Sequence, residues 1–263
     1  MTPDGRKQLI AVGLFVAFYA LLAFVAYLLT PLEQLAAPGQ TVPAATSSMP
    51  RWQLAAMGAG LVLVVYGLLA VAGSWFARRL ELPMMYRPGA GWRAWLLWPM
   101  VIGLLFGVIL VIMDQALARA NATSGFPHPA FPLSVIASGA AGIGEEILFR
   151  GFVMGLWAFL FDLILRRWRG KKAALWIGNV LAALAVSASH IPAAMLLLKV
   201  ASPAAIPAPA MMELFLLNGS LGLVAGERYM RNGLVAAMGV HFWADVVWHV
   251  IWPALGLAAA TGL

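Results

Sequence analysis

The sequence predicts an all-α protein, a polytopic transmembrane helix bundle of about seven to eight spans. Of its 263 residues 63% are apolar and 10% are charged, and the mean hydropathy is +0.89, outside the range of soluble domains. The apolar runs are long and lack the alternation of barrel strands, so the spans must be helices. Since a span takes about 20 residues, we expect a single integral membrane domain over residues 1–263.

Seven apolar runs are the expected spans. They are Leu9 to Thr30, Gln53 to Ala77, Trp92 to Met113, Phe131 to Leu165, Ala173 to Leu198, Ile206 to Gly226 and Asn232 to Trp252. The first run exceeds the core of a signal peptide, which has about 7 to 15 residues, and is interpreted as a retained span. The fourth is over-long for one crossing. The tail Pro253 to Leu263 is too short to cross and is predicted to be a half-span or an interfacial segment.

Basic residues are divided unequally between alternate loops. One set holds Arg51, Arg119 and Lys199, and the other holds Arg6, Lys7, Arg78, Arg79, Arg87, Arg93, Arg166, Arg167, Arg169, Lys171, Lys172, Arg228 and Arg231. Because Lys and Arg stay on the cytoplasmic side, we expect a cytoplasmic amino terminus, in a bacterial inner membrane. The net charge of +7 follows from these flanks and suits anionic lipid. Tryptophans gather at span ends, so no nucleic-acid partner is expected.

The fourth span carries Glu145, Glu146 and Arg150. Charges in hydrocarbon cost several kcal/mol and mark functional sites by default. Glu146 and Arg150 are four residues apart, share a helix face and can form a charge-assisted pair. Glu145 points about 100° away from Glu146. It is left without that partner and is the candidate general base.

Histidines mark two further spans. His190 lies in the fifth span among small residues, which let another helix approach closely. In the seventh span His241, Asp245 and His249 follow at four-residue spacing, so they form one stripe that can hold a water or a metal. It is improbable that one unpaired glutamate, two histidines and one aspartate on three different spans serve only to fill the core.

The depths of two of these residues agree. Glu145 lies 21 residues before Arg166, roughly 31 Å at 1.5 Å per residue. His190 lies 18 residues after Lys172, about 27 Å by the same rise. Both are therefore predicted at a similar height, far from the basic membrane edge.

Plainer interpretations stay open for some of these residues. The pair of Glu146 and Arg150 can serve only to lock helix packing. His190 can donate to a carbonyl near a helix break, and His249 fits an interfacial position. Other acidic residues are expected to be solvated or paired, less securely for the last of them: Asp114, Asp162, Glu227 and Glu213. Glycines of the fourth span are predicted to be packing positions: Gly139, Gly142, Gly144, Gly151 and Gly155.

The pattern Glu145-Glu146-x-x-x-Arg150, a histidine on the next apolar segment and His241-x-x-x-Asp245 resembles a known family. This is the CAAX protease and bacteriocin-processing family (CPBP, Abi-like), which includes the type II CAAX prenyl protease, or Ras-converting enzyme. The resemblance covers residues 131–252, the expected catalytic core. Two positions depart from the family pattern, Val186 where Phe is usual and Asp245 where Asn is frequent.

The resemblance implies an intramembrane glutamate protease. The implied roles are water activation by Glu145 with His190 close to it, oxyanion stabilisation by His241 and Asp245, and orientation of the site by Glu146 and Arg150. An ionised aspartate would repel an oxyanion, so Asp245 must be protonated or accept from His241. We expect the second arrangement, with His241 as the donor and Asp245 as its orienter.

The expected function is therefore hydrolysis of a peptide bond near the membrane by a glutamate-activated water. The expected partners are the lipid bilayer and a peptide or protein substrate, with or without a lipid anchor. No cofactor is expected, although Glu145, His190, His241 and Asp245 could ligate zinc if they converged. Two alternatives stay open: a catalytically inactive scaffold, immunity or regulatory protein of the same family, and an ion- or proton-coupled transporter, which the lack of an internal repeat disfavours.

Overall fold

The computed structural model describes residues 3–30, 49–121 and 128–256. Within these residues every regular element is helical, and seven helices are long and apolar enough to cross a membrane. The spans are Asp4–Leu29, Arg51–Arg79, Arg93–Arg119, Leu133–Trp168, Lys171–Leu196, Ala208–Asn232 and Leu234–Ala254. The prediction of an all-α transmembrane bundle is confirmed. The apolar tail predicted from Pro253 is described only as far as Gly256, and most of it lies outside the described residues.

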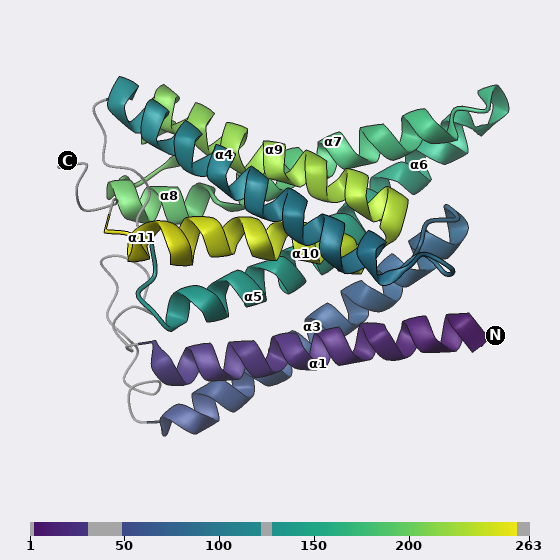
Figure 1. Cartoon of the computed structure of the whole chain (residues 1–263), viewed down its shortest axis with the longest axis horizontal. Helices are drawn as coiled ribbons and strands as arrows, with labels where there is room; N and C mark the ends of the chain where they lie inside the picture. The colour runs from purple at the N-terminus through teal and green to yellow at the C-terminus, as the bar shows by residue number, and fades with distance from the viewer. Residues whose placement is uncertain (1–2, 31–48, 122–127, 257–263) are drawn as a thin grey trace.

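Fifteen elements make up these spans and their connections (Figure 1). They are α1 (Pro3–Leu29), α3 (Arg51–Arg79), η2 (Arg93–Leu97), α4 (Trp98–Asn121), α5 (Leu133–Glu145), η3 (Glu146–Met154), α6 (Gly155–Leu165), η4 (Arg166–Trp168), α7 (Lys171–Ser189), α8 (Ile191–Leu198), η5 (Pro203–Ala205), α9 (Ala208–Asn232), α10 (Leu234–Asp245), η6 (Val246–Ile251) and α11 (Trp252–Ala254). The segments η2, η3 and η6 are π-helical, and η4 and η5 are 3₁₀ turns.

Helix α10 occupies the centre of the bundle, in contact with α4, α5 and α9 (Figure 1). The most apolar stretch of its span is 56% buried, against 17% and 11% for the first two spans, α1 and α3. Those two helices pack mainly on each other at one edge of the bundle. The polar stripe of α10 therefore faces protein and not lipid.

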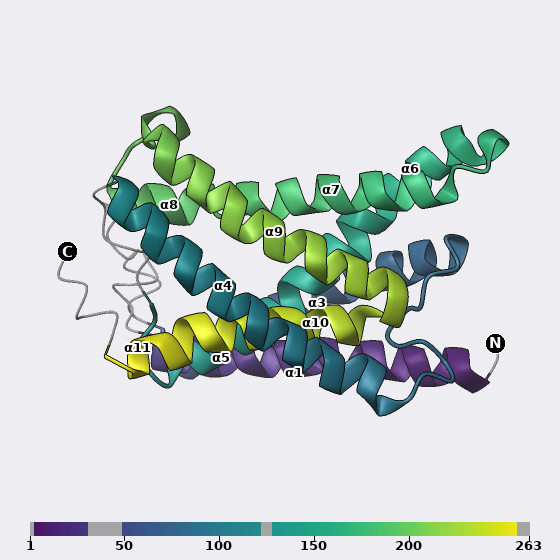
Figure 2. The same ribbon diagram turned by 45° about the horizontal axis from the view of Figure 1, so that its top comes forward.

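The over-long fourth span is one helical run, Leu133–Trp168, composed of α5, η3, α6 and η4. It crosses the bundle obliquely, with α5 near one edge and α6 near the opposite one in both views (Figures 1 and 2). Its π-helical part η3 begins at Glu146, directly after Glu145. Single π-helical turns inside α-helices frequently occur at functional sites, and this one sits on the charged motif.

Two glycines of this run show why it can pass so close to its neighbours. A Cβ atom on Gly142 would lie 3.1 Å from Cβ of Phe242 on α10, and one on Gly155 would lie 2.9 Å from Cβ of Phe76 on α3. Both distances are tighter than ordinary van der Waals contact. The interpretation of these glycines as packing positions is confirmed.

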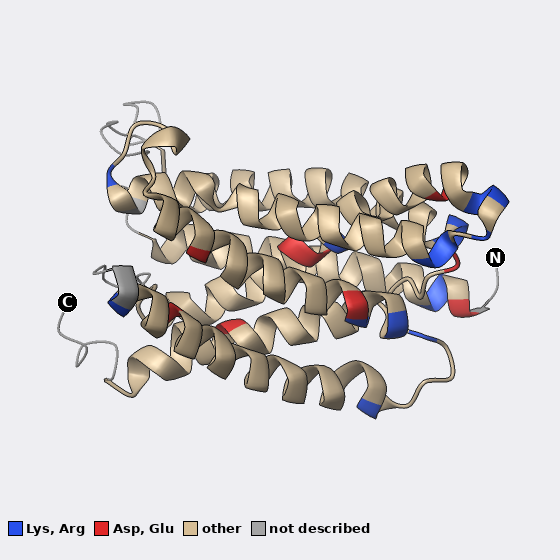
Figure 3. Ribbon diagram, turned by 90° about the horizontal axis from the view of Figure 1, so that it is seen from above, with Lys and Arg blue, Asp and Glu red and all other residues tan. Residues whose placement is uncertain are grey.

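Basic side chains gather at one end of the bundle (Figure 3). At this basic face Lys171 Nζ lies 2.6 Å from Glu81 Oε2, and Arg87 Nε donates to the backbone oxygen of Arg231 at 2.6 Å. At the opposite end Arg51 Nη2 donates to the backbone oxygen of Tyr27 at 2.6 Å. The two sets of loops thus lie at opposite ends, as the alternation of basic residues predicts.

Candidate active site

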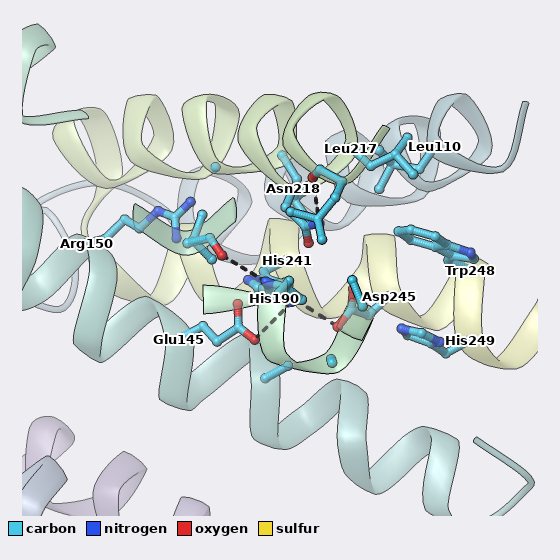
Figure 4. Close-up of a pocket in the computed structure, with 17 residues that line it drawn as sticks. Leu110, Glu145, Arg150, His190, Leu217, Asn218, His241, Asp245, Trp248 and His249 are labelled. Carbon is cyan, nitrogen blue, oxygen red and sulfur yellow. Dashed lines mark hydrogen bonds and ion pairs between the residues drawn. The ribbon is translucent and has the colours of Figure 1, made fainter. Parts of the chain in front are cut away.

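One cavity of about 270 Å³ brings the predicted residues together (Figure 4). Glu145, His190, His241 and Asp245 all line it. They come from α5, from the end of α7 and from α10, three separate spans. Apolar residues of α4 and α9, such as Leu110 and those around Asn218, complete the walls. Ionisable groups that lie far apart in the sequence therefore share one solvent-sized space.

His190 presents one ring nitrogen to Glu145. The helix α7 ends at Ser189, and His190 follows at its C-cap. Its Nδ1 atom lies 2.8 Å from the backbone oxygen of Val186. Because a carbonyl oxygen only accepts, Nδ1 carries a proton and donates. The plainer interpretation of His190 is correct for this nitrogen, while Nε2 lies 3.8 Å from Glu145 Oε1 and faces the cavity.

Glu146 points away from the cavity and binds two cationic or polar partners. Its Oε2 atom lies 3.3 Å from Arg150 Nε, with both side chains almost completely buried. Its Oε1 atom lies 2.7 Å from His241 Nδ1. The expected pair of Glu146 and Arg150 is present, and the same carboxylate also orients a histidine from another span.

Asp245 lies on the other side of the His241 ring, with Oδ2 at 3.6 Å from Nε2. This separation is longer than a hydrogen bond. The expectation that Asp245 orients His241 is wrong in this respect, because the orienting hydrogen bond runs from Nδ1 to Glu146. Helical spacing places Asp245 beside His241 on one helix, but it does not reveal a shorter contact from a neighbouring helix.

Exposure divides the site into an open part and a closed part. The side chains of His190 and Glu145 are 34% and 26% exposed. Those of His241 and Asp245 are 8% and 10% exposed. Glu145 Oε2 has no hydrogen-bond partner among the described residues. This oxygen is itself buried, whereas the Glu145 side chain as a whole is partly exposed.

Sequence reasoning missed several neighbours of the site. His249 lines the cavity next to Trp248, so it shares the stripe of His241 and Asp245 that its spacing predicts, and the interfacial alternative is wrong. Its Nδ1 atom lies 3.2 Å from Nδ1 of His128, which precedes the fourth span. Asn218 of α9 also lines the cavity, and no motif marks it. Asp114, expected to be solvated or paired, is buried and accepts a hydrogen bond from Gln115 Nε2 at 3.1 Å, and Glu213 is buried as well.

The donor atoms do not fit a metal ion. Across residues 3–30, 49–121 and 128–256, no three His, Asp or Glu side chains are arranged as metal ligands. Both ring nitrogens of His241 face carboxylates, and Nδ1 of His190 faces a carbonyl. A shared zinc site would need a different arrangement of these rings.

Comparison with known proteins supports the resemblance seen in the sequence. Residues 127–247 match the family model described as type II CAAX prenyl endopeptidase, Rce1-like. This segment contains Glu145, Glu146, Arg150, His190, His241 and Asp245. No curated protein and no solved structure matches the chain.

Proposed function

Residues 127–247 of this chain belong to the Rce1-like family of CAAX intramembrane proteases, and on this premise we propose that the cavity hydrolyses a peptide bond with a water activated by Glu145. Membership in a protease family indicates a protein or peptide substrate at the membrane. The glutamate mechanism is the further step, and the arrangement of the side chains supports it.

Glu145 is the proposed general base. Its side chain lines the cavity and is 26% exposed, which leaves it free to bind a water, whereas Glu146 does not line the cavity and is held by Arg150 and His241. Nε2 of His190 lies 3.8 Å away, and a water beside this gap can hydrogen bond to both groups. Glu145 takes one proton from that water, and the oxygen attacks the substrate carbonyl.

His241 is the proposed electrophilic partner. Its Nδ1 proton is committed to Glu146, so Nε2 donates to the tetrahedral oxyanion only when the ring holds both protons. Carboxylates at both nitrogens, Glu146 and Asp245, supply the compensating negative charge. A donor held in place before the reaction stabilises the developing charge without reorganisation.

Collapse of the intermediate returns the proton. The carbon–nitrogen bond breaks, the carbonyl re-forms, and the proton held by Glu145 passes to the leaving amine. The products are a free carboxyl terminus and a free amino terminus. In this scheme Glu146, which does not line the cavity, acts with Arg150 to position His241.

The observation that carries the proposal is the different placement of the two adjacent glutamates, one in the cavity and one in a buried ion pair. A scaffold protein has no need of a partly exposed carboxylate in a cavity that histidines line. A proton-coupled transporter would need flux that continues without peptide cleavage.

Replacement of Glu145 tests the mechanism. We expect Glu145→Gln, which keeps the shape of the side chain and removes the base, to lower cleavage by about 10²–10⁴-fold. The assay is mass-spectrometric detection of products from a library of membrane-anchored peptides incubated with the full chain in lipid nanodiscs. Glu81→Gln, at a fully exposed carboxylate on the basic face, is the matched control. Equal cleavage by the Glu145 variant and the control would rule out the glutamate mechanism, and flux without cleavage would support transport.

A further inference from the structure

The cavity lies towards one end of the bundle. Its walls on α9 run from Leu214 to Gly222, and α9 starts at Ala208, at the end opposite the basic face. On the seventh span, three of its four lining residues, Asp245, Trp248 and His249, come after the midpoint of Leu234–Ala254. This span starts next to the basic face, so the cavity lies mainly in the half remote from that face.

Two exposed wall residues mark the mouth. His190 caps α7 at its end away from the basic face, and its side chain is 34% exposed. Ala193, in the short helix α8 beyond it, lines the cavity and is exposed. Because both residues border the cavity and are also exposed at the surface of the bundle, the cavity opens at this end.

The other end of the cavity is closed. Arg150 lies at this end with 1% of its surface exposed. A Cβ atom on Gly222 of α9 would lie 2.6 Å from its Nη2 atom, so the two helices leave no passage there. One turn further towards the basic face, Met154 is completely buried and belongs to the same core cluster as Tyr229. No route through these packed side chains connects the cavity with the basic face.

From this geometry we propose that the substrate enters from the membrane face opposite the basic one, so that the cleaved bond is presented on the non-cytoplasmic side. The inference rests on the proposed function for what happens in the cavity and on the basic loops for the identity of the faces. The substrate class is then an exported or membrane-anchored peptide that faces outward. A cytosolic protein tail does not reach a cavity that opens on that side.

The walls add a requirement on the residues next to the cleaved bond. Leu110, Leu214, Leu217 and Trp248 are all buried and line the cavity. Arg150, which also lines the cavity, is already paired with Glu146. Apolar side chains therefore match the pocket, whereas acidic ones would meet Glu145 and Asp245 and be repelled.

The absence of cysteine in the chain permits a direct test by single-cysteine labelling. Ala193→Cys reports on the mouth of the cavity. Ser202→Cys, an exposed position at the same end, and Lys172→Cys, an exposed position on the basic face, are the two controls. A membrane-impermeant maleimide is added either to intact cells or to inverted membrane vesicles made from them.

We expect Ala193→Cys and Ser202→Cys to label at least tenfold faster than Lys172→Cys in intact cells, with the order reversed in inverted vesicles. Labelling of Ala193→Cys together with Lys172→Cys would overturn the proposal. Labelling of both controls but never of Ala193→Cys would overturn it as well, because the mouth would then be closed to water at that face.

The labelling result does not depend on catalysis, so the two proposals can fail separately. The same labels in a Glu145→Gln background are expected at unchanged rates. Outward access with no cleavage of any peptide would refute the protease alone. Cleavage of an anchored apolar peptide displayed only on the cytoplasmic side would refute the access route alone.

Discussion

Nδ1 of His241 lies 2.7 Å from Oε1 of Glu146, which links the seventh span to the buried ion pair of the fourth. The other oxygen of Glu146 faces Arg150 at 3.3 Å. One carboxylate therefore holds a fixed cation and a histidine ring at the same time. The adjacent glutamates thus have different environments, since Glu145 lines the cavity and Glu146 lies in the buried ion pair.

Glu146→Gln removes the charge and keeps the size of the side chain. We expect a loss of about 3–5 kcal/mol in the free energy of unfolding, because a buried Arg150 without its partner is strongly destabilising. Thermal unfolding in detergent measures this change. Glu145→Gln is the matched control and should change stability far less, since its ion-pair contact is longer and partly exposed. Equal losses from the two variants would contradict the division of roles.

Asp245→Asn tests whether the aspartate contributes charge or a hydrogen bond. The neutral amide does not repel an oxyanion, and Glu146 still orients His241, so cleavage should stay within about tenfold of the parent. Asp245→Ala leaves Nε2 of His241 without its neighbour and should cost about 10²-fold, the scale of one lost transition-state interaction. The measurement is turnover of the same peptide by both variants. Similar losses for Asn and Ala would show that the charge itself is required.

Gly222→Ala tests the close approach of α9 to the ion pair. A Cβ at this position meets Arg150 Nη2 at 2.6 Å, so Arg150 must move. Overpacking of this kind costs about 1–3 kcal/mol, and the shift of Arg150 should lower cleavage through Glu146 and His241. Gly60→Ala, where a Cβ would meet nothing within 4 Å, is the control. Parent-like stability and cleavage of Gly222→Ala would refute the closed end of the cavity.

Chelation addresses the metal question. Since no three His, Asp or Glu side chains are arranged as metal ligands in the described part of the chain, we expect cleavage to continue at an unchanged rate in excess EDTA. The measurement is product formation after dialysis against the chelator, with and without added zinc. Loss of cleavage that zinc restores would establish a metal enzyme and require the histidine rings to rearrange.

The contact between His128 and His249 predicts a dependence on pH. Burial lowers the pKa of His128 below its ordinary value of 6.5, against a smaller opposing effect from Asp114. A histidine with a lowered pKa contributes stability above pH 6.5 that is lost as the pH falls through its folded-state pKa. The unfolding temperature of the parent should therefore drop further between pH 7 and pH 5 than that of His128→Phe. Parallel curves would show that His128 does not titrate with folding.

The sequence alone was sufficient for the fold class, the seven spans and the local pairs. Hydrophobic length and the 3.6-residue helical period are properties of short segments, so the shared face of Glu146 and Arg150 and the separate direction of Glu145 follow from spacing. The family match covers residues 127–247, the segment that contains these motifs. The roles of Glu145 and His190 in catalysis stay predictions until the variants are measured.

Tertiary structure decided the contacts between spans. The rotation of the seventh span, α10 with η6, brings His241 against Glu146 and places His249 at the cavity. Gly222 lets α9 approach and close one end of the cavity. These contacts between spans depend on how each helix is rotated and tilted against its neighbours and on its π-helical segments. The spacing of residues within one helix does not determine how two helices pack against each other.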